Sequence, residues 1–201
     1  MSNYINQYLL EVEEIAKKID KNQINKVIER LVRLKKEKGR LFFLGVGGSA
    51  GNCSHAVNDF RKIGQIESYT PGDNVSELTA RTNDEGWETI FSNWLEISNL
   101  NNKDVVFILS VGGGNTDKNV SINIVKAIDY CLQTKSDVVG IVSRDGGHTA
   151  QSAIACVKIP IISSNTITPH AEAWQAVIWH LMVTDPRIIS YSNKWESIEK
   201  K

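Results

Sequence analysis

The sequence predicts a doubly wound α/β domain, in which a parallel sheet lies between layers of helices, preceded by two further helices. Segments with the 3.6-residue periodicity of helices alternate with four short runs that are apolar at almost every position, 41–44, 105–109, 138–142 and 156–162. Such runs are typical of strands buried on both faces, as parallel sheets require. Glycine-rich turns directly follow the first two runs. Strands and helices in this alternation indicate an open parallel sheet.

The elements follow in a simple order along the chain. Apolar residues at helical spacing predict the two leading helices, over 4–19 and over about 24–34. The four apolar runs are the predicted strands. The remaining periodic segments are predicted as the helices of the α/β domain, namely 50–62, 84–98, 120–134 and 170–183.

Composition excludes several classes of protein. The 201 residues are 41% hydrophobic and 23% charged, which indicates one globular domain rather than a disordered chain. Lys plus Arg and Asp plus Glu are both 23, so we expect no nucleic-acid or membrane partner drawn by bulk charge. The start of the chain lacks a secretory signal, and no apolar stretch approaches the roughly 20 residues of a membrane span. Three cysteines without a CxxC pair predict neither disulfides nor a cysteine-bound zinc, and we expect a soluble, cytoplasmic protein.

The two glycine-rich turns, 45–52 and 110–116, are candidate ligand sites. Ligands of open α/β sheets bind beyond the carboxyl ends of the strands, where both turns are expected. Glycines let backbone N–H groups approach an anion, and a following helix adds partial positive charge. Neither turn is a P-loop, and the first fits a dinucleotide fingerprint poorly, so no nucleotide cofactor is expected. Glycine turns also form tight strand–helix junctions, but two turns with Ser, Thr and Asn favour a phosphate or polyol site.

Two pairs of polar residues have spacings that suit metal or acid–base chemistry. His55 and Asp59 are four apart on one helix face. Glu172 and His180 are eight apart, about 12 Å of helical rise, with the small Ala176 between them. The set suits zinc or a similar divalent ion, and it equally suits a carboxylate base beside an imidazole. The alternative for each histidine alone is a hydrogen-bonded interior residue.

With these motifs in this order, the chain resembles the sugar isomerase (SIS) domain family, and within it the phosphoheptose isomerases that act on sedoheptulose 7-phosphate. The resemblance spans nearly the whole chain. It rests on the leading helices and on Gly47-Gly48-Ser49 with His55, Asn83-Asp84-x-Gly86, the turn 110–116, Asp145-Gly146-Gly147 and His180.

The resemblance implies the architecture and the assembly. The sheet would have five parallel strands, and the chain would form a homotetramer through its leading helices, with sites at subunit interfaces. Residues 1–38 would be the helical pair for oligomer packing, 39–185 the phosphosugar-binding SIS domain and 186–201 a C-terminal tail.

The resemblance also implies three groups of site residues. The substrate-contacting residues would be Val46, Gly47, Gly48, Ser49, Asn83 and Asp84. The phosphate turn would be formed by Ser110, Gly112, Gly113, Gly114, Asn115 and Thr116. The metal and acid–base cluster would be His55, Asp59, Glu172 and His180, with Zn²⁺ or another divalent cation as cofactor.

This sequence departs from the family pattern at several of these positions. The family usually has Glu at position 59, Gln at 172 and Asn at 46, and its phosphate turn is richer in Ser and Thr. Asp59 is one methylene shorter than Glu, and a misplaced reacting group is costly. Glu172 could supply the missing reach.

The function expected from residues and resemblance is aldose–ketose isomerisation of a phosphorylated sugar through an enediol, with sedoheptulose 7-phosphate as the expected substrate. Asp59, or Glu172 in its place, would remove the proton beside the carbonyl, and His180 would move protons on oxygen. The alternative is a non-catalytic SIS protein, a phosphosugar-binding regulator or a protein adaptor. The unusual residues at 59 and 172 favour that alternative, whereas the retained histidines and carboxylates favour the enzyme. A nucleotide-binding dehydrogenase ranks third.

Overall fold

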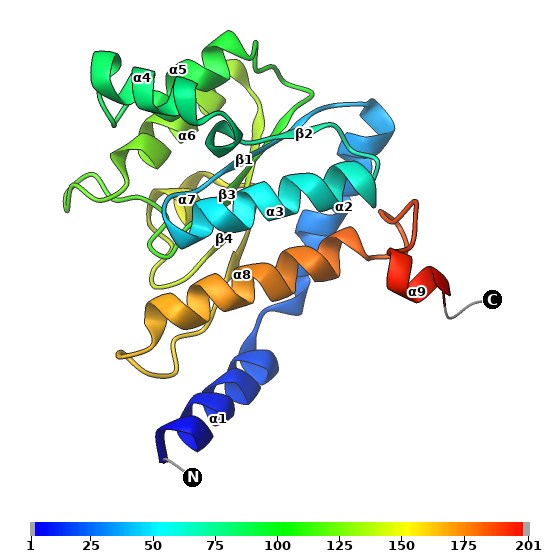
Figure 1. The fold of residues 1–201 in the computed structure, drawn as a ribbon. Helices are drawn as coiled ribbons and strands as arrows, with labels where there is room; N and C mark the ends of the chain where they lie inside the picture. The colour runs from blue at the N-terminus through cyan, green and yellow to red at the C-terminus, as the bar shows by residue number, and fades with distance from the viewer. Residues whose placement is uncertain (1–2, 199–201) are drawn as a thin grey trace.

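The computed structural model describes residues 3–198, and its centre is a sheet of five parallel strands (Figure 1). The strands are β1 (Leu41–Leu44), β2 (Ser68–Tyr69), β3 (Val105–Leu109), β4 (Asp137–Val142) and β5 (Ala155–Lys158). Their order in the sheet is β2-β1-β3-β4-β5, and every neighbouring pair is parallel. The predicted doubly wound fold, its five strands and the two leading helices are therefore confirmed.

Helices cover both faces of the sheet (Figure 1). The helices are α1 (Asn3–Lys18), α2 (Lys21–Glu37), α3 (Gly48–Lys62), η1 (Pro71–Asp73), α4 (Val75–Glu85), α5 (Ile90–Ile97), α6 (Ile122–Thr134), α7 (Gly147–Ser152), α8 (Ile167–Val183) and α9 (Lys194–Ile198) within residues 3–198. Successive strand side chains point to opposite faces. Phe43 and Phe107 therefore pack in the core under α2, α3 and α8, whereas Phe42 and Val106 pack in the core under α5 and α6.

Two of the predicted elements differ from the structure in their boundaries, and no apolar run predicts β2. The segment 84–98 is not one helix: α4 ends at Glu85, Gly86 adopts a φ of 89°, and α5 begins at Ile90. No residue of α4 is buried, so no apolar periodicity marks it in the sequence. The last strand ends at Lys158 rather than at Ile162. Strand β2 has two residues, so it is too short to be marked by an apolar run in the sequence.

The first helix extends beyond the body of the molecule and contacts the start of α8 through a buried acid (Figure 1). Glu11 is 3% exposed, and its carboxylate accepts hydrogen bonds from Thr166 Oγ1 at 2.6 Å and His170 Nε2 at 2.8 Å. The hydrogen bond from Thr166 is the main cause that lowers the pKa of Glu11, followed by those from Gln7 and His170. Within residues 3–198, no helix has the length and apolar character to cross a membrane.

The lowered pKa of Glu11 makes part of the folding stability depend on pH. Its ionised form contributes this stability above the ordinary glutamate pKa of about 4.3, and the contribution is lost as the pH falls through the lower folded-state value. Glu11→Gln should therefore be less stable than wild type at pH 7, and the gap should close in acid. The difference in stability is measured by urea unfolding midpoints of both proteins between pH 7 and pH 3. Glu13→Gln is the control, because Glu13 is exposed. A gap that stays constant over this range would contradict the role of the Glu11 charge.

Candidate active site on helices α3 and α8

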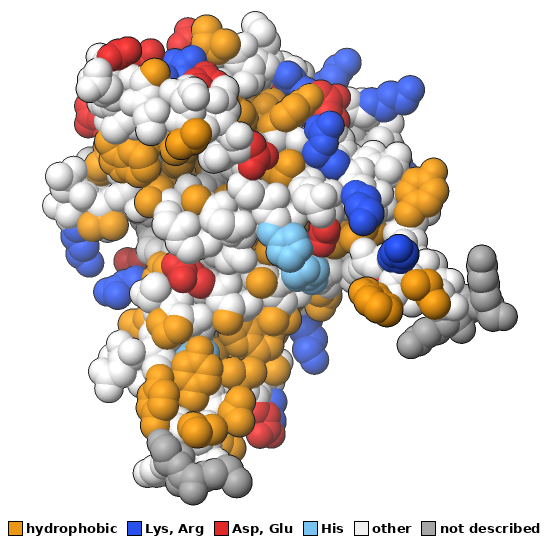
Figure 2. All heavy atoms as spheres, viewed as in Figure 1, with side chains coloured by type: hydrophobic (Ala, Val, Ile, Leu, Met, Phe, Trp, Pro, Cys, Tyr) orange, Lys and Arg blue, Asp and Glu red, His pale blue; other side chains and the backbone are white. Residues whose placement is uncertain are grey.

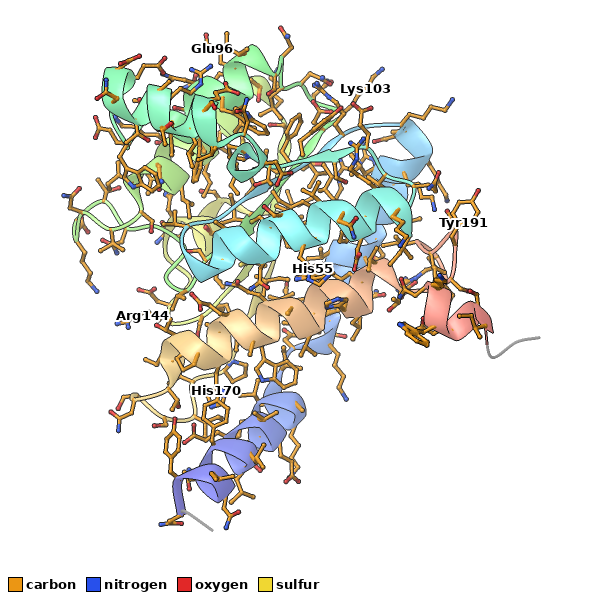
Figure 3. All side chains as sticks on the ribbon, in the orientation of Figure 1. His55, Glu96, Lys103, Arg144, His170 and Tyr191 are labelled. Atoms are coloured by element: carbon orange, nitrogen blue, oxygen red, sulfur yellow. The ribbon has the colours of Figure 1, made fainter. Side chains whose placement is uncertain are left out.

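Helices α3 and α8 lie side by side and run in the same direction (Figures 1 and 3). Near their beginnings, Asn52 Nδ2 donates to the carbonyl of Glu172 at 3.0 Å and to Gln175 Oε1 at 3.1 Å. Gln175 is fully buried, so this contact fixes the register of one helix against the other inside the protein. Two helical turns further on, the same register brings the second half of α3 against the end of α8.

At that point three of the predicted ligands converge. Asp59 Oδ2 lies 3.7 Å from both His55 Nε2 and His180 Nε2. One candidate ligand atom from each residue lies within 4.8 Å of the others. The Asp59 side chain is 13% exposed, whereas those of His55 and His180 are 57% and 45% exposed. The cluster is therefore a sheltered carboxylate with two imidazoles open to solvent, and histidines form a patch on this face (Figure 2).

The hydrogen bond made by His180 determines the position of its proton. His180 Nδ1 lies 2.7 Å from the carbonyl oxygen of Ala176. Because a carbonyl can only accept, Nδ1 carries a proton, and in the neutral imidazole Nε2 is left as an acceptor. This is the tautomer in which Nε2 can take up a proton or bind a metal ion.

Trp179 contacts the rings of both His55 and His180, a role that the sequence did not reveal. Its side chain is fully buried, and its ring stacks on that of His180 with the centroids 3.5 Å apart. The rings of Trp179 and His55 make a T-shaped contact with the centroids 4.8 Å apart. Contact with a rigid buried ring restricts the rotamers of both imidazoles, which preserves the geometry of the cluster. A tryptophan in an apolar helix is typical of a core residue, so only the fold shows this second role.

Glu172 lies apart from the other three predicted ligands. Its carboxylate packs directly over Gly48, the first residue of α3, and a Cβ on Gly48 would overlap it. The partial positive charge of the helix N-terminus favours an anion there. Glu172 and His180 are separated by about 12 Å of helical rise, which explains why one cluster does not include both. A role for Glu172 as fourth ligand stays a prediction.

The second glycine turn borders a cavity of about 280 Å³. Gly112, Gly114 and Asn115 line it, together with Lys118 and Arg144, which the sequence analysis did not single out. Three other residues of the predicted phosphate turn do not line the cavity. Ser110 is buried and its hydroxyl accepts from the Gly113 amide at 3.0 Å, while Thr116 is exposed.

The remaining predicted substrate residues lie in two places. In the first glycine turn, Gly47 has a φ of 64°, Val46 is partly exposed and Ser49 is buried at the start of α3. Asn83 and Asp84 are exposed near the end of α4. Their only side-chain hydrogen bond in the described part of the chain joins them to each other, at 2.7 Å. In Figure 1, α4 lies apart from the ends of α3 and α8 that carry the histidine cluster.

Comparison with known proteins identifies the family. Residues 3–143 match the family model of the SIS domain. The chain belongs to the SIS domain family. The phosphoheptose isomerase of Aneurinibacillus thermoaerophilus is 26% identical to this SIS protein over 183 residues, covering 88% of this chain and 86% of that protein. The phosphoheptose isomerase of Rhodospirillum rubrum is 29% identical over 149 residues, covering 72% and 73% of the two chains.

A solved structure has the same SIS fold. The phosphoheptose isomerase of Neisseria gonorrhoeae matches with a TM-score of 0.76 at 20% identity, over 89% of this chain and 93% of that one. At this identity the likeness concerns the fold. The resemblance inferred from the sequence motifs is thus confirmed at the level of the family and of the fold.

The contact between Glu172 and Gly48 can be tested by a double-mutant cycle. Because a Cβ on Gly48 would push the flexible Glu172 carboxylate away from the N-terminus of α3, Gly48→Ala should cost the charge–dipole contact, about 0.3–1 kcal/mol of the free energy of unfolding. In the Glu172→Ala background that contact is absent, so the same substitution should cost much less. Urea denaturation measures all four proteins. Equal losses in both backgrounds would contradict the contact.

Proposed function

We propose that this SIS protein is an aldose–ketose isomerase that converts a phosphorylated sugar, sedoheptulose 7-phosphate, to the aldoheptose 7-phosphate through an enediol. The proposal rests chiefly on the convergence of His55, Asp59 and His180, because a pure binder has no need of a sheltered carboxylate between two imidazoles. The relatives named phosphoheptose isomerase support the same reaction.

The cluster has the groups that this reaction requires. Asp59 removes the proton from the carbon beside the carbonyl and returns it to the neighbouring carbon. His180 Nε2, free to accept, takes the hydroxyl proton and gives it to the carbonyl oxygen. The hydrogen ends on the adjacent carbon, so the sugar itself is both oxidised and reduced. The isomerisation therefore needs no nucleotide cofactor.

Alternatively, the same three residues suit a divalent ion, and we propose zinc. A side-chain atom that binds the ion does not at the same time accept a proton. Two imidazole nitrogens and a carboxylate oxygen are ligands that zinc accepts, and a three-residue set leaves one position for substrate. His55, Asp59 and His180 would hold the ion, because one candidate ligand atom from each lies within 4.8 Å of the others. When bound, the ion would supply Lewis-acid stabilisation of negative charge on the substrate oxygens.

Distances along α3 support an active site shared between subunits. Asp59 lies about 16 Å of helical rise beyond Gly48, whereas the turn 110–116 follows β3, the direct neighbour of β1, at the Gly48 end. An extended seven-carbon sugar phosphate is shorter than this separation. One chain would therefore bind the phosphate while another presents its histidine cluster to the reacting carbons.

The leading helices offer the surface for such an assembly. Hydrophobic side chains gather over α1 (Figure 2), among them Ile5, Leu9 and Leu10, each at least half exposed. Burial of this surface in a homotetramer would remove it from water. The division into 1–38, 39–185 and 186–201 fits this assembly and stays a prediction. A cytoplasmic location and the absence of nucleic-acid and membrane partners also stay predictions.

Activity measurements separate the enzyme from the phosphosugar-binding regulator or adaptor. Wild-type protein should convert sedoheptulose 7-phosphate to an aldoheptose phosphate. Asp59→Asn and His180→Ala should each lower kcat by about 10²–10⁴-fold, because each removes an acid–base group. His148→Ala is the matched control, since His148 pairs with Asp129 outside the cluster. No turnover by wild type, or normal turnover by His180→Ala, would contradict the isomerase.

A further inference from the structure

The cavity beside the second glycine turn carries an unused pair of cations. We infer that Lys118 and Arg144 grip the phosphate group of the substrate and make its charge a requirement for binding. This inference rests on the proposed function, and it assigns to both residues a role in substrate recognition. Neither belongs to the glycine turns or to the histidine cluster, and Arg144 comes from a different loop than Lys118.

Hydrogen bonds between the second glycine turn and the start of α7 fix the walls of this cavity. The amides of His148 and Thr149 donate to the carbonyls of Gly114 and Gly113 at 2.8 and 2.9 Å. Thr149 Oγ1 also donates to Gly113 at 2.8 Å. The turn after β3 is thereby held against the start of α7, just beyond Arg144. A cavity with such bonded walls has its shape before a ligand arrives.

The two cations on these walls are not neutralised within the protein. In the described range 3–198, neither Lys118 nor Arg144 makes a side-chain hydrogen bond or an ion pair, and Arg144 is the one arginine of which this holds. Asp145 also lines the cavity but pairs with neither cation, and its carboxylate accepts from the Gly147 amide at 3.2 Å. Two cations and one carboxylate leave the cavity net positive.

The turn itself presents few other groups to an anion. The Ser110 hydroxyl is engaged with the Gly113 amide, and Thr116 lies outside the lining. Gly112 and Gly114 line the cavity, and their amides donate no hydrogen bond within residues 3–198. Two backbone donors and two cations suit a phosphate dianion, because the guanidinium can bind two of its oxygens at once and the ammonium adds a point charge. The positive charges of Lys118 and Arg144 thus take the place of the hydroxyl groups that this turn lacks for binding phosphate.

Binding of inorganic phosphate tests the role of Lys118 and Arg144 independently of turnover. Isothermal titration calorimetry of wild type, Lys118→Gln and Arg144→Gln should show about tenfold weaker binding for each variant, since each loses one charge-assisted contact. Lys103→Gln is the matched control, because Lys103 precedes β3 and lies far from Arg144 (Figure 3). Arg144→Lys should retain part of the affinity. In turnover, both Gln variants should raise KM for the phosphosugar with little change in kcat.

The outcomes separate this inference from the proposed function. Three results would contradict phosphate binding by Lys118 and Arg144. They are a wild type that binds no phosphate, variants that all bind it with the wild-type affinity, and a Lys103→Gln variant that loses as much affinity as the others. The protein could instead bind phosphate through both cations and show no isomerase activity. This result would support the role of Lys118 and Arg144 and contradict the proposed isomerase function. Should Arg144→Gln not fold, Lys118→Gln and Arg144→Lys decide, because a lysine at position 144 keeps the charge.

Discussion

The register between α3 and α8 is the constraint on which the rest of the candidate site depends. It is set where the Asn52 side chain reaches both Glu172 and the buried Gln175. Because helices are stiff, a contact in the first turns determines which side chains meet two turns later. There His180 meets His55 and Asp59, and Trp179 restrains both rings. A slip of one residue would rotate His180 by about 100° away from the carboxylate.

The same register separates two carboxylates into different environments. Glu172 lies over the N-terminus of α3, where the helix dipole stabilises its charge. Asp59 lies at the other end of the helix pair, beside two imidazoles. The Asp59 carboxylate thus lies between two imidazoles, and the Glu172 carboxylate lies near the glycine turns. An exchange of duties between these two carboxylates stays a prediction.

Much of this arrangement could be predicted from the sequence. Apolar runs mark buried strands, so β1, β3 and β4 were placed to within a residue, and the spacing of His55 and Asp59 fixed their shared helix face. Helix α4 was not predicted as a separate helix, because it buries no residue and therefore has no apolar periodicity. The second role of Trp179 and the approach of Arg144 to the turn 110–116 depend on long-range packing. Local periodicity carries no information about such contacts.

A crystal structure with bound sedoheptulose 7-phosphate would test the central claim most directly. We expect the reacting carbons to lie against the Asp59 carboxylate and His180 of one subunit. We expect the phosphate to lie in the cavity beside the turn 110–116 of a neighbouring subunit. A sugar whose carbonyl end lies away from the histidine cluster in every subunit would contradict the account.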